Sequence, residues 1–224
     1  MQAAPINAGE YTPSHLELFA RQLAEQHPIA KSREQNSLLS IALLRWSNSL
    51  HEAYQFFRTS ASKELTVFRA GEWMLDNYYI IEQTLREIEK DLPPSYYQQL
   101  PKLDGTSLKH YPRIFALASE LVAYSQCQID LPQLAAFVLS YQQTAVLTTG
   151  ELWALPIMLR IALLENLSAA VAAVTGINAP TKLNIDSLPP ASPDMTDDAV
   201  VANCFISLRE IPVEHFLMQF FTHS

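Results

Sequence analysis

The chain has 224 residues, of which 49% are hydrophobic and 17% are charged, and its 15 basic and 23 acidic residues give a net charge of −8. This composition is sufficient for a hydrophobic core, but Lys and Arg are not clustered as phosphate binding requires. Nucleic acid and anionic lipid surfaces are therefore excluded as expected partners.

Apolar residues at steps of three and four predict helices throughout the first half of the chain, and only five glycines against 14 prolines argue against hairpin-rich β structure. Ser14 can begin the first helix, and His27-Pro28 ends it. The same spacing predicts helices over residues 35–58 and about 64–90.

Capping residues and prolines predict where the helices of the second half of the chain begin and end. Residues 95–110, which follow Pro93-Pro94, are expected to form an irregular connection. The expected N-caps are Asp130, Thr148 or Thr149, and Thr196. The predicted helices cover residues 112–125, 130 to about 141, 151–174 and 196–209, with a last short helix from 212.

These elements predict an all-α fold, an irregular bundle of about seven to nine helices around a central apolar helix. Residues 1–12 are expected to be a flexible tail, and residues 13–224 a single domain with an exposed loop near 175–194. Aromatic residues near the end of the chain predict an exposed apolar patch, formed by Phe216, Phe220 and Phe221.

The cellular compartment is predicted from three absent signals. Cys127 and Cys204 form no CxxC pair, so two buried thiols in a reducing compartment are expected. The polar N-terminus lacks the pattern of a secretory signal. The most apolar stretch, residues 152–164, contains Pro156 and Arg160 and is expected to be too short and interrupted to span a bilayer.

The sequence contains no motif of a self-contained active site. A phosphate-binding loop, a GxSxG motif and a pair of histidines at helical metal-site spacing are all missing. No catalytic residue, metal ligand or cofactor is therefore predicted.

Four polar residues in the most apolar predicted helix require partners, because an unpaired buried charge costs several kcal/mol. These residues are Glu151, Arg160, Glu165 and Asn166. Pairing with other helices is expected, and the candidate partners are Glu72, Asp76, Arg86 and Arg113. The alternative is a carboxylate pair, such as Glu151 with Asp76, acting as acid and base on a sugar.

Aromatic residues are dense in the middle of the chain, where they can be core or can stack on sugar rings. The residues considered for stacking are Tyr96, Tyr97, Tyr111 and Trp153.

Four stretches resemble the N-terminal region of bacterial cyclic β-1,2-glucan synthases. They are GEWMLDNYYIIEQTLREIEKDLPPSYYQQLPKL (71–103), YPRIFALASELV (111–122), YQQTAVLTTGELWALPIMLRIALLENL (141–167) and VANCFISLR (201–209). The resemblance implies an origin in a very large inner-membrane enzyme that makes cyclic glucan from UDP-glucose. This chain lacks the Asp motifs and the Q-x-x-R-W motif of the family's glycosyltransferase.

The resemblance therefore implies a non-catalytic scaffold or regulatory domain on the cytoplasmic side of the bacterial inner membrane, with the enzyme's other domains as partners. The matching polar residues, which include Glu72, Asp76 and Asn77, are expected to form an internal network or a docking surface. The alternatives are a β-glucan-binding module, with Tyr96, Tyr97, Tyr111 or Trp153 lining a groove, and a small carbohydrate-active enzyme.

Overall fold

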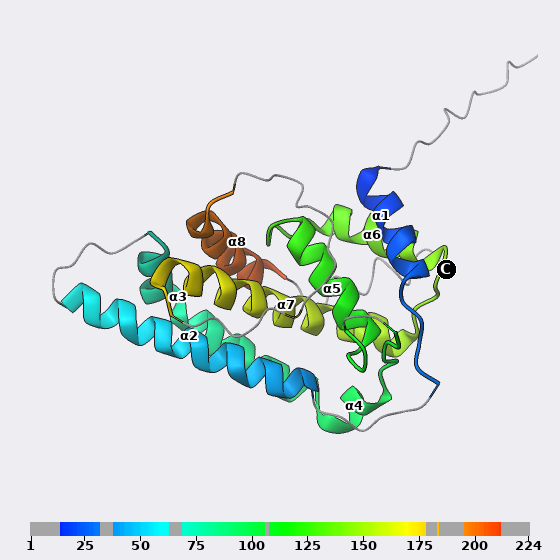
Figure 1. The fold of residues 1–224 in the computed structure, drawn as a ribbon, viewed down its shortest axis with the longest axis horizontal. Helices are drawn as coiled ribbons and strands as arrows, with labels where there is room; N and C mark the ends of the chain where they lie inside the picture. Colours follow the sequence, from blue (N-terminus) through cyan, green and yellow to red (C-terminus); the bar gives the residue numbers. More distant parts are fainter. Residues whose placement is uncertain are drawn as a thin grey trace, which may run out of the picture.

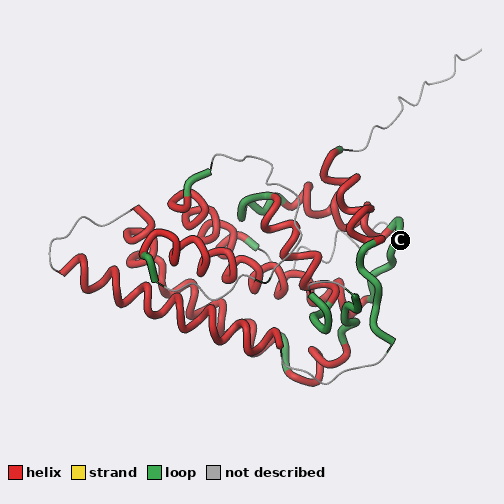
Figure 2. Tube along the Cα trace, in the orientation of Figure 1, coloured by secondary structure: helices red, strands yellow, loops and turns green. Residues whose placement is uncertain are grey.

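The computed structural model describes residues 14–31, 38–62, 69–105, 108–177, 183 and 195–211. In these ranges the chain is helical, with two isolated β-bridges and no strand (Figure 2). The predicted all-α fold is confirmed. The eight helices of the described ranges, drawn in Figure 1, are α1 (His15–Glu25), α2 (Leu38–Ser62), α3 (Arg69–Asp91), α4 (Pro94–Gln99), α5 (Arg113–Tyr124), α6 (Leu131–Gln142), α7 (Thr149–Thr175) and α8 (Asp197–Glu210).

Side-chain caps fix where several helices begin. Ser14 precedes α1 and Thr148 precedes α7, and each forms a capping box with a glutamate three residues later. Asp130 and Thr196 accept hydrogen bonds from backbone N–H groups in the first turns of α6 and α8. Gly176 ends α7 in the left-handed conformation, at φ +70°. The four N-terminal caps lie where the sequence predicts these helices to begin.

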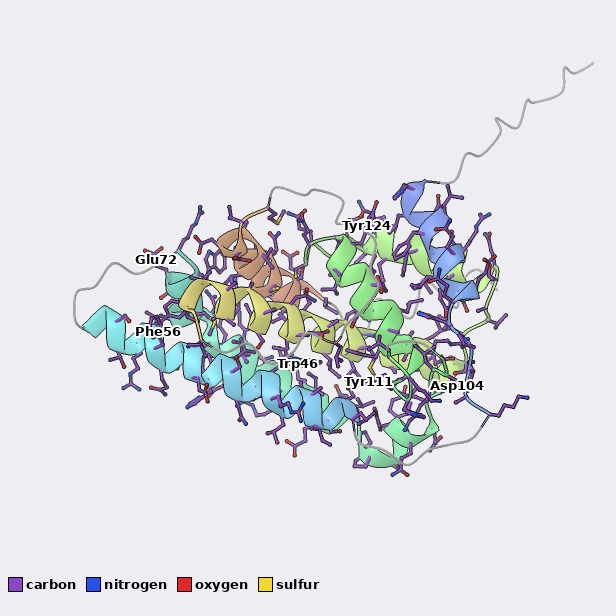
Figure 3. The ribbon with its side chains drawn as sticks, viewed as in Figure 1. Trp46, Phe56, Glu72, Asp104, Tyr111 and Tyr124 are labelled. Carbon is purple, nitrogen blue, oxygen red and sulfur yellow. The ribbon has the colours of Figure 1, made fainter. Side chains whose placement is uncertain are left out.

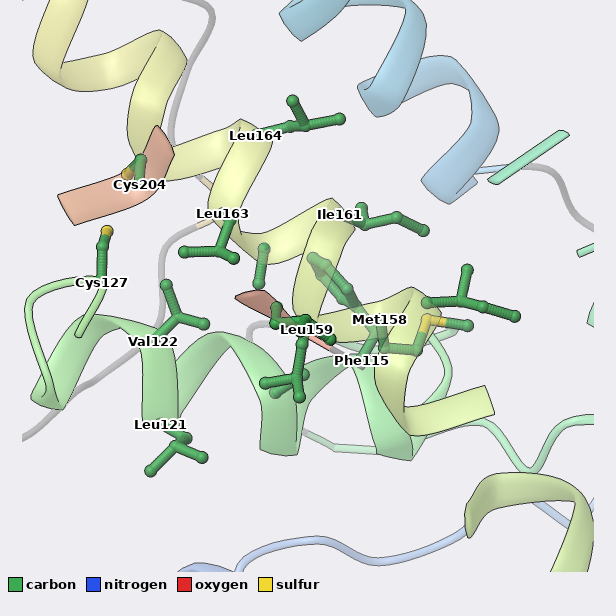
Figure 4. Close-up of a cluster of buried hydrophobic side chains, with 14 of the residues drawn as sticks. Phe115, Leu121, Val122, Cys127, Met158, Leu159, Ile161, Leu163, Leu164 and Cys204 are labelled. Carbon is green, nitrogen blue, oxygen red and sulfur yellow. The ribbon is translucent and has the colours of Figure 1, made fainter. Parts of the chain in front are cut away.

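Helix α7 is the centre of the fold, as its apolar character on all sides predicted. It packs against α2, α3, α5 and α8, and most of its side chains are buried. Figure 4 shows part of this core, where Met158, Leu159 and Leu163 of α7 lie with Phe115 and Val122 of α5. A central helix with no polar face can be accommodated only because neighbouring helices cover all of its sides.

The length of α7 corrects one expectation. Its 27 residues are long and apolar enough to cross a membrane by length and composition, whereas the sequence pattern had indicated a shorter, interrupted stretch. Of its most apolar 18-residue window, 83% is buried inside the fold. Packing against other helices therefore accounts for its apolar composition, as in the core helix of a globular protein.

Two further expectations about helix boundaries are wrong. Helix α2 continues to Ser62, four residues beyond the predicted end at residue 58. Helix α4 occupies part of the expected irregular connection, because Pro94 at the first helical position is already set to a helical φ.

Several predicted features lie outside the described residues. They are the tail at residues 1–12, most of the loop at 175–194, and the last helix with its patch of Phe216, Phe220 and Phe221.

Helices α1 and α6 form a separate layer beside the α7 core. They pack against each other, and the ring centroids of Phe19 and Phe137 lie 6.1 Å apart between them. Phe19 also stacks on Tyr124, at the end of α5, with ring centroids 6.1 Å apart. This contact joins the layer to the rest of the fold.

Candidate functional site

A buried ion pair joins the first turns of α5 and α7. Arg113 donates from Nε to Glu151 Oε1 at 2.8 Å and from Nη2 to Glu151 Oε2 at 2.6 Å. The side chain of Arg113 is 4% exposed and that of Glu151 is fully buried. Glu151 Oε2 also accepts from the backbone N–H of Thr148 at 2.8 Å, and Arg113 Nη2 donates to the carbonyl of Val146 at 2.9 Å. The carboxylate is therefore fully engaged by groups of the fold.

The ion pair continues into a buried polar cluster that reaches α6 and the segment after α1. Tyr141 Oη lies 3.0 Å from Nδ1 of His27. Burial, and secondarily the positive charge of Arg113, lower the pKa of His27 from 6.5 to about 4. Burial likewise raises the pKa of Tyr141 well above its usual value. Both side chains are consequently neutral at pH 7, and the positive charge of Arg113 is matched by Glu151.

The other polar residues of α7 have separate environments. Arg160 Nη1 lies 3.3 Å from Glu87 Oε2, and its Nη2 donates to the carbonyl of Ile211 at 3.3 Å. Glu165 Oε1 accepts from the backbone N–H of Leu183 at 2.9 Å. In these contacts Arg160 bonds to α3 and to the residue after α8, whereas Glu165 bonds to Leu183.

Asn166 is bonded within α7 itself. Its Nδ2 donates to the carbonyl of Ala162, four residues earlier in the same helix, at 2.9 Å.

Three predicted partners of the α7 charges lie instead on the surface of α3. Glu72, Asp76 and Arg86 are exposed, and Figure 3 labels Glu72 near the beginning of that helix. Of the four candidate partners, the structure brings only Arg113 to an α7 charge. Glu87 pairs with Arg160 instead, and its sequence context does not distinguish it from the other charged residues in the second half of α3.

Asn77 joins α3 to α8. Its Nδ2 donates to the carbonyl of Trp73 at 3.0 Å, and its Oδ1 accepts from Arg209 Nη2 at 3.0 Å. These contacts of Asn77 are local to this helix pair and distant in the chain from Glu151.

The structure does not bring Glu151 and Asp76 together. Helices α3 and α7 run antiparallel (Figure 1), and the contact between Arg160 and Glu87 sets their relative position. The helical rise then places Asp76 and Glu151 about 30 Å apart along the helices, whereas paired glycosidase carboxylates lie roughly 5–10 Å apart. The predicted acid–base pair is wrong for these two residues.

Two of the four candidate stacking residues lie near the start of α7. Tyr96 Oη donates to the carbonyl of Gly150 at 2.6 Å, and Trp153 lies one turn further along the same helix. Trp153 is 53% exposed and Tyr96 is half-buried.

The other two candidates are placed elsewhere. Tyr97 is buried, with Lys102 Nζ 4.9 Å from the centre of its ring. The ring of Tyr111 is tilted by 31° against that of Phe115. Tyr111 and Trp46, both labelled in Figure 3, border a hollow of about 160 Å³. A single groove lined by all four aromatic residues is therefore not formed.

Within the described ranges no group of three or more His, Cys, Asp or Glu side chains could hold a metal ion. Cys127 and Cys204 are both buried and neither forms a disulfide, so the prediction of two buried thiols is confirmed. An apolar hollow of about 550 Å³ lies between α2 and α3.

No protein-family model matches the chain. Over 100 residues, which are 44% of the chain, the sequence is 41% identical to a curated relative, and it thus contains a region related to part of a cyclic glucan synthase. That relative is the cyclic beta-(1,2)-glucan synthase NdvB of Rhizobium meliloti (strain 1021). The match spans 3% of the relative's length. The resemblance seen in the sequence motifs is confirmed.

Proposed function

We propose that this chain is a non-catalytic scaffold domain of a cyclic β-1,2-glucan synthase, located on the cytoplasmic side of the bacterial inner membrane. The observation that carries the proposal is how the polar residues of the family pattern divide. Glu151 and Arg160, in α7, are paired inside the fold, whereas Glu72 and Asp76, on α3, face solvent. Side chains neutralised inside a fold support its shape, and exposed ones can contact a partner.

The docking surface in this proposal is the exposed stripe of α3, which consists of Glu72, Asp76, Tyr79 and Arg86. The four residues follow one another at steps of four, three and seven and are all exposed. Such steps keep side chains on one face of a helix. Two carboxylates near the beginning of α3 favour a partner surface that carries Lys or Arg, because complementary charges set the orientation of a complex.

The test is binding of the intact chain to the remaining domains of the synthase, measured by calorimetry. Replacing Asp76 by Arg (Asp76→Arg) should weaken binding by about tenfold or more, because like charges then face each other. Glu25→Arg is the matched control, since it makes the same charge change at an exposed site on α1. Equal effects of the two variants, or no binding by the unmodified chain, would contradict the proposal.

The same preparation tests whether the chain has an activity of its own. Incubation with UDP-glucose or with β-1,2-glucan should release neither UDP nor glucose, because Glu151 is fully buried and bonded to Arg113. Release of either product that disappears in Glu151→Gln would overturn the scaffold assignment.

A second candidate function is binding of β-glucan at the exposed ring of Trp153, near the start of α7. The exposure of Trp153 favours it, because sugar rings stack on accessible aromatic faces. Titration with β-1,2-glucan should then change tryptophan fluorescence, and Trp153→Ala should abolish the change. Tyr79→Ala, at another exposed aromatic residue, is the control. An unchanged spectrum at millimolar sugar would exclude this function.

A further inference from the structure

The two cysteines of the chain meet where the loop that follows α5 packs against α8. Cys127, on the loop, is 1% exposed, and Cys204, on α8, is fully buried. In Figure 4 the two side chains extend toward one another. They are distant in the sequence and form no disulfide in this structure. The fold therefore brings together two thiols that the sites described above do not use.

Side chains of α8 hold the loop in place on both sides of Cys204. Asn203 Nδ2 donates to the carbonyl of Gln126 at 3.2 Å. One turn later, Ser207 Oγ donates to the carbonyl of Cys127 at 2.5 Å. Residues three apart in a helix lie on the same face, so Cys204 and Ser207 both face the loop. The hydrogen bond to the backbone of Cys127 thus fixes this residue beside Cys204.

The backbone of the loop has an unfavourable conformation at Cys127. Gln126 and Cys127 have φ angles of +49° and +64°. Glycine adopts this left-handed region freely, whereas a residue with a Cβ does so at a cost. Such a conformation persists where surrounding contacts determine it, as the bonds from Asn203 and Ser207 do here. The sequence thus has a thiol at a position where the backbone alone would favour glycine.

A hollow beside the loop gives a small oxidant a way toward the two thiols. Its volume is about 280 Å³, and Gln128 and Asn203 are among the residues that line it. Gln128 directly follows Cys127, and Asn203 directly precedes Cys204. An oxidant in this hollow is one residue along the chain from each thiol, so a local opening of the loop is sufficient for reaction.

We propose that Cys127 and Cys204 form a disulfide when the chain meets a peroxide, and that the bond locks the loop after α5 to α8. The thiolate of Cys127 attacks one oxygen of hydrogen peroxide, which breaks the O–O bond, releases hydroxide and leaves a sulfenic acid. The thiolate of Cys204 attacks that sulfur, forms the S–S bond and displaces a second hydroxide. The protons lost by the two thiols convert both hydroxides to water, and the two sulfurs give two electrons to the peroxide.

The bond joins two of the elements that surround the central helix, because α5 and α8 both pack against α7. A crosslink between residues far apart in the sequence restricts the unfolded chain and so stabilises the fold. In a reducing compartment the pair remains as two thiols. The inference is independent of the proposed scaffold function, since the docking stripe of α3 takes no part in it.

The test is treatment of the folded full chain with hydrogen peroxide, followed by intact-mass spectrometry and peptide mapping. The oxidised chain should be monomeric, lighter by two hydrogen atoms, and should give a crosslinked peptide pair that contains positions 127 and 204. Its midpoint of thermal unfolding should rise by about 5 °C or more and return to the starting value with dithiothreitol. Cysteines that remain open to alkylation after denaturation, that are oxidised singly, or that pair between two chains would overturn the proposal.

Two single variants are matched controls and test the order of the steps. Cys204→Ser should stop at the sulfenic acid of Cys127, which a cyclic diketone probe traps, because no second thiol remains. Cys127→Ser should be trapped about tenfold less, because Cys204 lies within a helix that opens less readily than a loop. Equal trapping in the two variants would overturn this order. A peroxide-induced rise of the unfolding midpoint in either variant would overturn the disulfide as its cause.

Discussion

Arg113 and Glu151 connect the beginnings of two helices. Arg113 is the first residue of α5, and Glu151 lies in the first turn of α7. The same carboxylate accepts from the backbone of Thr148 and so completes the capping box of α7. One residue pair therefore fixes both the start of the central helix and the position of its neighbour.

We expect Arg113→Met to destabilise the chain by about 3–5 kcal/mol, because it leaves the carboxylate of Glu151 buried without its charge partner. Guanidinium unfolding followed by circular dichroism measures the change. The double variant Arg113→Met, Glu151→Gln should recover part of the loss, since no uncompensated charge remains. A single variant that costs less than about 1 kcal/mol, the range of exposed pairs, would contradict this role.

Stability should decrease as the pH falls from 6.5 to 4, and His27 is the cause. Its pKa in the fold is about 4, so over this window the unfolded chain binds a proton that the folded chain does not. The loss is complete below pH 4, absent above 6.5, and amounts to about 3 kcal/mol from this residue. Denaturant midpoints at pH 7.5, 5.5 and 4.5 measure it.

His27→Asn is the control for this pH dependence. Asparagine keeps a polar side chain near Tyr141 but does not titrate, so the acid limb of the stability profile should become shallower. An identical acid limb in the variant would assign the pH dependence to other groups.

Arg160→Ala and Glu87→Gln should lower the free energy of unfolding by different amounts, although both remove the same ion pair. Arg160 is buried and also donates to Ile211, whereas the side chain of Glu87 is 35% exposed. We expect Arg160→Ala to cost about 2–4 kcal/mol and Glu87→Gln less than about 1 kcal/mol. Equal losses in urea unfolding would indicate that the charge pair, and not burial of the arginine, determines the effect.

Replacing the two glycines at opposite ends of α7 by alanine should change the stability of the chain in opposite directions. Gly176 has φ +70° and nothing lies within 4 Å of an added Cβ, so Gly176→Ala should cost about 1 kcal/mol through backbone strain alone. Gly150 lies inside the first turn, and the nearest atom to an added Cβ is Tyr96 Cε2 at 3.8 Å. Gly150→Ala should therefore stabilise the helix by about 0.5–1 kcal/mol. Thermal unfolding measures both, and equal signs would contradict the interpretation.

The helix boundaries could be predicted where a side chain acts on its own backbone. Ser14, Asp130, Thr148 and Thr196 are such cases, because a cap bonds to residues two or three positions away. The central position of α7 could also be predicted, since a helix apolar on all sides must be enclosed. Helix α4 was missed because six residues carry too few apolar positions to define a period.

The polar partners could not be predicted to the same degree. The apolar sequence around Glu151 and Arg160 predicts that both need partners. Which charged residue of α3 faces α7 depends on how α3 is rotated about its own axis, and the sequence does not give that rotation. Glu87 faces α7 and Arg86 faces solvent although they are adjacent in sequence. The interaction of His27 with Tyr141 joins residues 114 positions apart, and no local pattern reports it.

The packing of α2, α3, α5 and α8 around α7 determines which parts of the molecule unfold first. None of these four helices can lose its contact with α7 without exposing core residues, whereas α1 and α6 pack mainly on each other. Partial unfolding should therefore occur in two tiers, with the α1–α6 layer detaching first and the remaining helices separating only in the global transition. Protease cleavage under native conditions would then begin near this layer and leave a resistant core built on α7.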